Sequence, residues 1–191
     1  GTIDLEDERS IAAAADRLKP AGPYSLIICA TGLLHGDGLA PERGLRDLDT
    51  ARLTRSFAVN AIGPALVMRH FLPLLPSNDR GVFAALSARV GSIGDNRLGG
   101  WYGYRSSKAA LNQFVRTAAV ELARTRPKAI CVALHPGTVD TAMSKPFQRG
   151  VAPERLFTPA FSAECLLKAI DKLERTDSGG FFDWAGIPIP Y

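Results

Sequence analysis

The sequence has few of the residues that build metal centres and disulfide frameworks. It contains three cysteines and three histidines among 191 residues. The cysteines lie in separate apolar segments without metal-site spacing, so we predict buried free thiols and a reducing compartment. The histidines have no cysteine or carboxylate partners at ligand spacing, so we predict no metal site. These residues are Cys29, Cys131 and Cys165, and His35, His70 and His135.

Long apolar runs, targeting segments and blocks of like charge are also missing. The chain has no uninterrupted apolar run of 18 residues and no signal-peptide pattern, which predicts a cytoplasmic protein with no membrane partner. The formal net charge is +4 and the basic residues are scattered, which predicts solvated surface and no nucleic-acid partner. The length predicts a single domain over residues 1–191 with a substantial core.

Short apolar runs alternate with helical patterns along the chain. Apolar runs without polar interruption predict strands buried on both faces, as in a parallel sheet covered by helices. We predict strands at 25–30, 81–87, 129–135 and 180–182, and helices at 10–18, 49–75, 103–124 and 161–174. The alternation predicts an α/β fold with a doubly wound, Rossmann-like parallel sheet.

The first part of a dinucleotide-binding sheet is missing from the start of this sequence. Such a sheet begins with a strand, a glycine-rich turn and a helix that holds a pyrophosphate, whereas this chain opens with a helical pattern. An all-apolar strand at 25–30 without a neighbour would be an exposed edge. We therefore expect roughly 50 residues to precede Gly1 in the full protein, which an intact mass would test.

The segment 99–122 reads GGWYGYRSSKAALNQFVRTAAVEL and has helical spacing from Gly103 onward. Tyr104 and Lys108 are four residues apart, so they share one helix face. A nearby ammonium favours the phenolate and lowers the pKa of a tyrosine. The pair therefore predicts a tuned acid and base, although a Tyr-x-x-x-Lys spacing alone is a weak motif.

The run Y-R-S-S-K-A-A-L-N, preceded by a glycine-rich connection, resembles the active-site helix of the short-chain dehydrogenase/reductase family, in particular its C-factor/sniffer-like branch. The resemblance extends over most of the chain, which would be the C-terminal three quarters of such a protein. It implies hydride transfer between NAD or NADP and a carbonyl or secondary alcohol, with Tyr104 as general acid/base and Lys108 beside the nicotinamide ribose. It also implies a homodimer or homotetramer assembled through the helices at 49–75 and 103–124.

Asn60 is similar to a helical asparagine of that family. Pro64, four residues later, has no N–H for the Asn60 carbonyl and crowds it. A buried free carbonyl needs a partner such as a water. We expect that water to lead to Lys108, as in the family; the alternative is a simple helix kink.

The family also uses a serine at the end of the strand before the tyrosine helix. The glycine at Gly91 aligns Ala88 with that serine, and Ser87 comes one residue early. Neighbouring strand side chains point to opposite faces. We expect a bulge to re-aim Ser87 toward the substrate, with Ser92, or no serine, as the alternatives.

Three further segments are similar to cofactor-binding motifs of the family. Asp4-Leu5 matches a pair that reads the adenine edge, with a polar helix start as the alternative. The segment 30–32 stands where the family has N-A-G, without its asparagine, and 136–141 resembles P-G-x-V-x-T, which binds the carboxamide. We therefore expect cofactor contacts from Asp4, Leu5, Ala30, Thr31, Gly32, Tyr104, Lys108, Pro136, Gly137, Val139 and Thr141.

A second hypothesis is a non-catalytic signalling or binding protein on a reductase scaffold. The shifted serine and the missing asparagine of N-A-G favour it. Tyr104, Lys108, Asn60 and the turn at 136–137 favour an enzyme, because a fold alone does not need that set. Protection against heat by NADH and by NADPH separately would discriminate between the hypotheses.

Overall fold

Within residues 1–36 and 38–191, which this computed structural model describes, four parallel strands form the central sheet in the order β1-β2-β3-β6. The interior strands are buried on both faces, as their unbroken apolar runs predict. At the outer edge, Ile28 of β1 is 40% exposed. The strands are β1 Leu26–Cys29, β2 Gly81–Leu86, β3 Ala129–His135 and β6 Phe181–Asp183.

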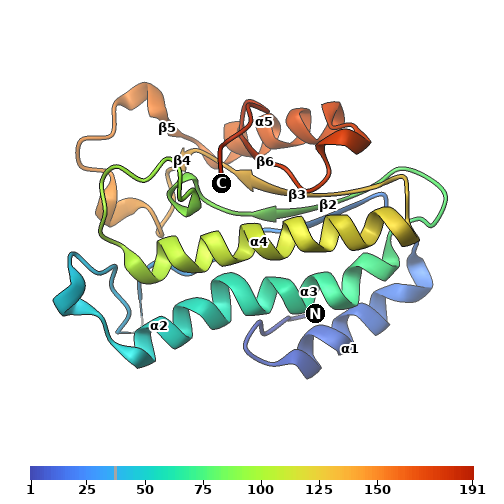
Figure 1. The fold of residues 1–191 in the computed structure, drawn as a ribbon, viewed down its shortest axis with the longest axis horizontal. Helices are drawn as coiled ribbons and strands as arrows, with labels where there is room; N and C mark the ends of the chain where they lie inside the picture. Colours follow the sequence, from blue (N-terminus) through green and yellow to red (C-terminus); the bar gives the residue numbers. More distant parts are fainter. Residues whose placement is uncertain (37) are drawn as a thin grey trace.

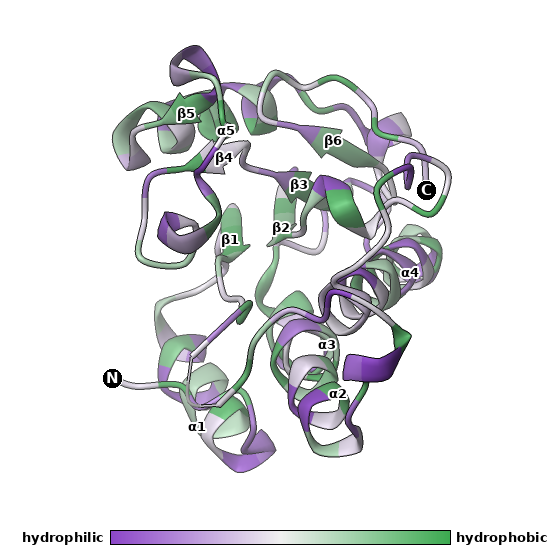
Figure 2. Cartoon of the chain, turned by 90° about the vertical axis from the view of Figure 1, so that its left-hand side faces the viewer, coloured by the Kyte–Doolittle hydropathy of each residue, from purple (hydrophilic) through white to green (hydrophobic). Residues whose placement is uncertain are grey.

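Helices cover both faces of the sheet, which confirms the doubly wound arrangement (Figure 1). On one face, α1, α3 and α4 pack over Phe83 and Cys131; on the other, α5 packs over Val82 and Val132. Side chains of successive strand residues therefore pack into two separate hydrophobic cores, one on each face of the sheet. Figure 2 shows the apolar strands between these helical layers. The helices are α1 Glu8–Leu18, α2 Thr50–Phe57, α3 Gly63–Phe71, α4 Tyr102–Thr125 and α5 Pro159–Lys172.

The predicted helix at 49–75 is a composite. A π-helical turn, Ala58–Ile62, joins α2 to α3, and the Gly63 N–H donates to the Ala58 carbonyl across it. The last turn, Leu72–Leu74, is a 3-10 helix. Because π turns are rare and are frequent at functional sites, this one marks the neighbourhood of Asn60.

The stretch between β3 and α5, where the sequence pattern predicted neither strand nor helix, contains a second small sheet. Its two parallel strands are β4 Thr138–Val139 and β5 Leu156–Phe157. Strands of two residues are too short to produce a period-2 pattern. The described chain also contains the 3-10 helices Lys19–Ala21, Leu45–Asp47, Arg89–Gly91, Lys145–Phe147, Pro153–Arg155 and Arg175–Asp177.

One helical run meets a length-and-composition criterion for a membrane span. It covers Thr50–Leu74, with a mean hydropathy of 1.2 over its best 18-residue window. Polar and charged residues interrupt this run, so the search for 18 consecutive apolar residues does not identify it. Its side chains Val67, Met68 and Phe71 lie in the core against the sheet, so the fold itself covers much of its apolar surface.

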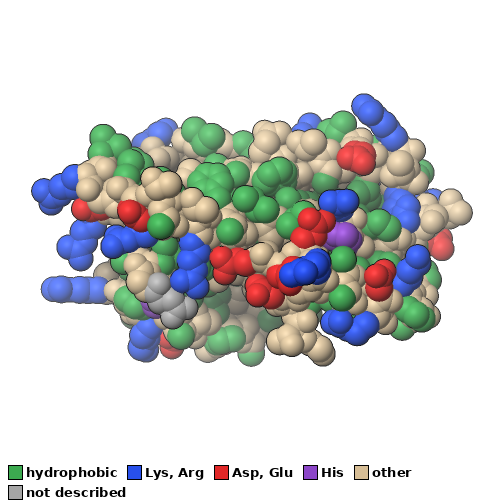
Figure 3. Space-filling view, turned by 90° about the horizontal axis from the view of Figure 1, so that it is seen from below, with side chains coloured by type: hydrophobic (Ala, Val, Ile, Leu, Met, Phe, Trp, Pro, Cys, Tyr) green, Lys and Arg blue, Asp and Glu red, His purple; other side chains and the backbone are tan. Residues whose placement is uncertain are grey.

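The surface and the thiols have ordinary surroundings. Over α1 and α3, on the face seen from below, acidic and basic side chains are interspersed across the centre (Figure 3). Cys29 and Cys131 are buried and Cys165 is half-buried, and all three are free. His70 lies 3.2 Å from a carboxylate oxygen of Glu8, on α1.

Candidate active site

Three predicted site residues meet beyond the C-terminal ends of β1 and β2. Lys108 is 2% exposed, and its Nζ donates to the carbonyl of Leu86, the last residue of β2, at 2.8 Å. A Cβ added to Gly32 would lie 3.6 Å from Lys108 Nζ and 3.6 Å from Asn60 Oδ1. The loop after β1, the π turn and α4 therefore converge at Gly32.

Asn60 is fully buried in the π turn, and its side chain holds the loop after β1. Its Oδ1 accepts the Leu33 N–H at 2.7 Å, and its Nδ2 donates to the Leu33 carbonyl at 2.7 Å. Nδ2 also lies 3.3 Å from Ser56 Oγ. The sequence assigned a role only to the main-chain carbonyl of Asn60; the side-chain clamp depends on a contact 27 residues away and left no local signal.

Tyr104 lies in the first turn of α4 and is half-buried. Lys108 Nζ is 5.9 Å from the centre of its ring, so the predicted pair does share a helix face. The Tyr104 hydroxyl bonds to none of the residues that the structure describes, which leaves it available to a ligand. The Ser107 hydroxyl donates to the Tyr104 main-chain carbonyl at 3.0 Å and fixes the backbone there.

Burial dominates the electrostatics of this pair. Loss of solvation raises the pKa of Tyr104 to about 12 and lowers the pKa of Lys108 to about 8, with Cys29 acting in the opposite direction on Lys108. We had predicted that Lys108 lowers the pKa of Tyr104. The structure differs because desolvation disfavours the charged form of each group, and burial is the cause of the shift at Tyr104. Tyr104 is therefore a protonated phenol at neutral pH.

The structure does not place Ser87 or Ser92 in the expected serine role. Ser87 is 4% exposed, and its hydroxyl donates to Asn112 Oδ1 on α4 at 2.7 Å. Ser92 is 1% exposed and accepts the Asp95 N–H at 3.0 Å. The strand pairing continues regularly past Leu86, since the Ser87 N–H donates to β3, so no bulge re-aims the side chain. Strand alternation points Ser87 into the packed layer beneath α4.

A hollow of about 520 Å³ adjoins Gly32. Its size suits part of a dinucleotide. One edge of it carries the Asp4 carboxylate, which also accepts the Glu6 N–H at 2.9 Å. Five predicted cofactor residues, Asp4, Leu5, Ala30, Thr31 and Gly32, line it together with Ile3, Glu6, Val59 and Met143.

The predicted carboxamide-binding turn follows β3. Gly137 has φ +80°, and a Cβ there would lie 2.5 Å from the ring of Phe157, so only glycine fits. The Pro136 carbonyl accepts the Ser162 hydroxyl at 2.8 Å, and Val139 belongs to β4. Thr141 is exposed, and its hydroxyl lies 3.4 Å from the Val139 carbonyl.

A chain of aromatic contacts leads from Tyr104 through Trp101 and Phe147 to His35. The Trp101 ring lies 6.3 Å from the Tyr104 ring and 5.0 Å from that of Phe147, which in turn lies 5.5 Å from His35. Trp101 therefore stands beside the candidate acid. Phe147, at the end of the 3-10 helix Lys145–Phe147, was missed, because no pattern in the sequence marks a ring that comes from a segment more than 40 residues away.

One glycine motif in the sequence was also missed. Gly32, Gly36 and Gly38 have the spacing G-x-x-x-G-x-G, which is typical of a dinucleotide-binding turn. They follow β1, but the chain then continues to the 3-10 helix Leu45–Asp47 and not directly into an α-helix. The motif therefore lacks the helix N-terminus that its chemistry requires.

Comparison with known proteins agrees with this geometry. The sequence profile described as short chain dehydrogenase matches residues 2–152. The C-signal protein of Myxococcus xanthus is 39% identical over 171 residues, which cover 89% of this chain and 94% of that protein. The chain belongs to the short-chain dehydrogenase/reductase family. It is therefore an NAD(P)-dependent oxidoreductase that acts on small molecules, and its similarity to C-signal agrees with the predicted branch.

Two further members of the family show how widely the similarity extends. The 1-hydroxy-2-glutathionyl-2-methyl-3-butene dehydrogenase of a Rhodococcus species is 33% identical over 180 residues, or 94% of this chain and 74% of that protein. An NADPH-bound carbonyl reductase from chicken fatty liver is 28% identical in sequence, and its crystal structure superposes with a TM-score of 0.84. The match covers 99% of this chain and 75% of the reductase chain.

Proposed function

We propose that this enzyme reduces the carbonyl group of a small molecule, with Tyr104 as the proton donor. The observation that carries the proposal is the convergence of Lys108 and Asn60 at Gly32, with the Tyr104 phenol on the same face of α4 as Lys108. The similarity to the NADPH-bound carbonyl reductase supports the same substrate class and cofactor.

The residues present fit a nicotinamide dinucleotide. Gly32 lines the hollow and also neighbours Lys108, since a Cβ on Gly32 would lie 3.6 Å from Nζ. The Lys108 ammonium uses one of its donors on the Leu86 carbonyl and has no other hydrogen-bond acceptor in the described part of the chain. The remaining donors suit a ribose hydroxyl. Gly32 keeps the approach open because a side chain there would contact Nζ. When bound, the nicotinamide supplies the hydride.

Each residue then has a defined task. Tyr104, a phenol that is protonated at neutral pH and whose pKa burial raises to about 12, gives its proton to the carbonyl oxygen. Lys108 lies close enough to its ring to stabilise the phenolate that this transfer leaves. Asn60 holds the loop after β1, and its main-chain carbonyl anchors the water that returns a proton to the site. The turn at 136–137 and Thr141 orient the carboxamide, and Asp4 and Leu5 contact the adenine.

The test compares Tyr104→Phe with Tyr102→Phe. Tyr102 is a neighbouring half-buried tyrosine on α4 and provides a matched control. With NADPH and NADH in turn and a panel of aldehydes and ketones, Tyr104→Phe should lower kcat by about 10²–10⁴-fold, while Tyr102→Phe keeps it within about threefold. Retention of a tenth or more of the activity by a folded Tyr104→Phe protein would refute Tyr104 as the acid.

A second candidate function is signalling or binding without turnover. Two observations favour it: the high coverage of the C-signal protein, and the engagement of both candidate serines inside the structure. Assays of the wild-type protein with the same panel, together with its protection against heat by NADPH, separate the two functions. A wild-type protein that NADPH protects from heat, but that reduces no member of the panel, would support the second function.

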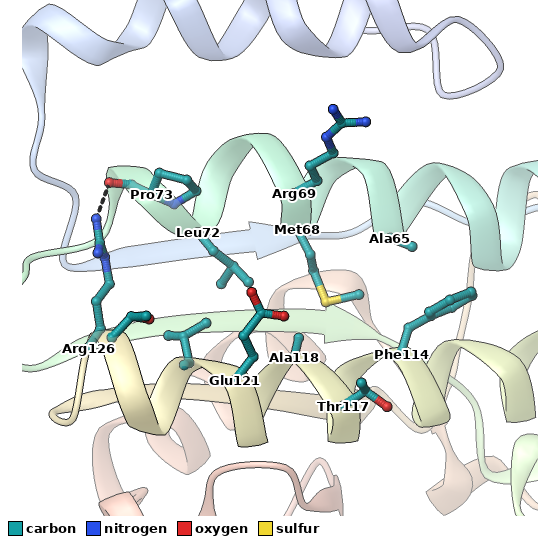
Figure 4. A pocket seen from close by; sticks show the side chains of 12 residues that line it. Ala65, Met68, Arg69, Leu72, Pro73, Phe114, Thr117, Ala118, Glu121 and Arg126 are labelled. Atoms are coloured by element: carbon teal, nitrogen blue, oxygen red, sulfur yellow. Dashed lines mark hydrogen bonds between the residues drawn. The ribbon is translucent and has the colours of Figure 1, made fainter.

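We also propose that a homodimer forms through α3 and α4. Met68 on α3 points toward α4, near Ala118 and Phe114 (Figure 4). These side chains line a groove of about 510 Å³ between the two helices. Phe114 is 42% exposed on its rim. Sedimentation equilibrium should give a dimer or a tetramer, and Ala118→Arg should dissociate it, whereas Gln113→Arg, on the exposed side of α4, should not.

A further inference from the structure

The helix that carries Tyr104 begins without a cap of its own. Its N-cap residue is Trp101, which has no side-chain capping bond. The first amides of a helix need acceptors from outside the helix, and Ser, Thr, Asp or Asn usually provide them. Trp101 is also left-handed, with φ +52°, and follows two glycines at φ +65°. A left-handed backbone is a genuine outlier for so bulky a residue.

Glu42, a residue 61 positions before Gly103, caps this helix from a distant loop. Its main-chain carbonyl accepts the Trp101 N–H at 2.6 Å, and its carboxylate Oε2 accepts the Gly103 N–H at 3.1 Å. Glu42 is 4% exposed. A Cβ on Gly103 would lie 2.8 Å from Oε1, so the glycine makes room for the carboxylate. Glu42 thus holds the main chain at Trp101 and at Gly103, three residues and one residue before Tyr104, through contacts between distant parts of the chain.

This arrangement costs free energy, and its position next to Tyr104 indicates its role. Within the described residues the Glu42 carboxylate accepts one hydrogen bond. Burying a carboxylate with so few partners is unfavourable, although the positive end of a helix offsets part of the cost. The left-handed Trp101 adds strain. Both features occur in the turn that carries Tyr104, and such local costs concentrate at functional sites.

The other side of the same turn is fixed by buried serines. Ser107 donates to the Tyr104 carbonyl, and its Oγ lies 3.3 Å from Ser56 Oγ, which accepts from Asn60. The main chain at Tyr104 is therefore held on its carbonyl side from the π turn and on its N–H side through Gly103. Glu42 supplies the second restraint, and no residue within α4 replaces it in the described chain.

We propose that Glu42 is a positioning residue, which acts through the Gly103 amide to hold Tyr104 in register with Lys108. The inference rests on the proposed role of Tyr104 as the acid. Without the capping bond the first turn of α4 frays, and Tyr104 spends less time in reach of the carbonyl oxygen. A misplacement of about 1 Å costs up to about 10²-fold in rate. Binding of the cofactor, which depends on Lys108 one turn further along α4 and on several loops, should change little.

The experiment compares Glu42→Ala with Glu42→Gln in the full-length holoenzyme. Glu42→Ala should lower kcat roughly 10- to 100-fold, with KM for NADPH within about twofold. Glu42→Gln keeps an acceptor for the Gly103 N–H and should restore kcat to within about threefold of wild type. Asp7→Ala, which removes the N-cap of α1, is the control: it should lower stability by a similar amount while kcat stays within about twofold.

Amide hydrogen exchange provides a readout that does not depend on turnover. Glu42→Ala should speed exchange at Trp101 and Gly103, while the amides near Leu122, in the last turns of α4, keep their protection. If Glu42→Ala does not fold, Gly103→Ala displaces the carboxylate by its methyl group and should lower kcat in the same way.

The outcomes are distinct. Wild-type kcat in Glu42→Ala or Gly103→Ala, or an equal loss of kcat in Glu42→Gln and Glu42→Ala, overturns the inference. A wild-type enzyme that reduces no carbonyl compound defeats the proposed function instead. In that case unchanged exchange at the first turn of α4 in Glu42→Ala still overturns the positioning role, and faster exchange there supports it.

Discussion

Replacing Lys108 with methionine should make the protein more stable and abolish its activity. Lys108 is 2% exposed, and its ammonium has one hydrogen bond, to the Leu86 carbonyl, in the described structure. Burial of a charge with so little compensation is unfavourable. Methionine has a similar volume and flexibility and carries no charge, so it should fill the same space without the desolvation cost.

The magnitude follows from the pKa of Lys108, which burial lowers from 10.5 to about 8. At about 1.4 kcal/mol for each pKa unit, folding disfavours the ammonium relative to the amine by about 3 kcal/mol. Methionine also leaves the Leu86 carbonyl unpaired, at a cost of about 1–3 kcal/mol. The variant should therefore gain up to about 2 kcal/mol in free energy of unfolding at pH 7.

The gain must depend on pH with a definite sign. Between pH 8 and pH 10.5 the unfolded chain binds the Lys108 proton and the folded chain releases it, so the contribution of Lys108 to wild-type stability rises with pH. From pH 7 to pH 9.5 the rise from this residue is about 2 kcal/mol, and Lys108→Met lacks it. Tyr104, with its pKa raised from 10.0 to about 12, lowers stability only as the pH passes 10, so the measurement ends at pH 9.5.

Urea denaturation of the wild type and of Lys108→Met at pH 7, 8 and 9.5 measures both effects. Lys128→Met, at an exposed position, is the control and should change the free energy of unfolding by less than about 0.5 kcal/mol at each pH. A Lys108→Met protein less stable than wild type at pH 7, or an advantage that does not shrink toward pH 9.5, would refute the desolvation argument.

Three other substitutions test the site. Ala88→Ser restores the family's donor at the strand end and should raise kcat/KM by about tenfold or more, measured with saturating NADPH; an unchanged value would mean that residue 88 does not face the carbonyl. Ser87→Ala should cost about 1 kcal/mol, because the Asn112 acceptor loses its donor, while kcat stays within about twofold; a large loss of kcat would return Ser87 to the catalytic set. Gly137→Ala, with a methyl 2.5 Å from the Phe157 ring and φ +80°, should lower stability by more than about 1 kcal/mol and raise KM for NADPH; wild-type values of both would contradict the geometry of the turn.

The regular elements were accessible from the sequence because their signals are local. The apolar run of β3 and its proline-glycine stop predicted the strand Ala129–His135 to the residue. The spacing of α4 predicted its length within one residue at each end, Tyr102 in place of Gly103 and Thr125 in place of Arg124. The π turn was not predicted, because Pro64 signals an interruption of the helix but not the form that it takes.

The sequence by itself determined the layered α/β fold, the family, and the presence of Tyr104 and Lys108 on one helix face, since each depends on spacing within a short segment. Tertiary structure alone decided the rest. Burial in the packed molecule raised the pKa of Tyr104. Three hydrogen bonds also depend on the tertiary structure: Ser87 donates to Asn112, Asn60 donates to the Leu33 carbonyl, and Glu42 accepts from the Gly103 N–H. Those outcomes depend on burial and on contacts between residues far apart in the chain, which only the packed molecule specifies.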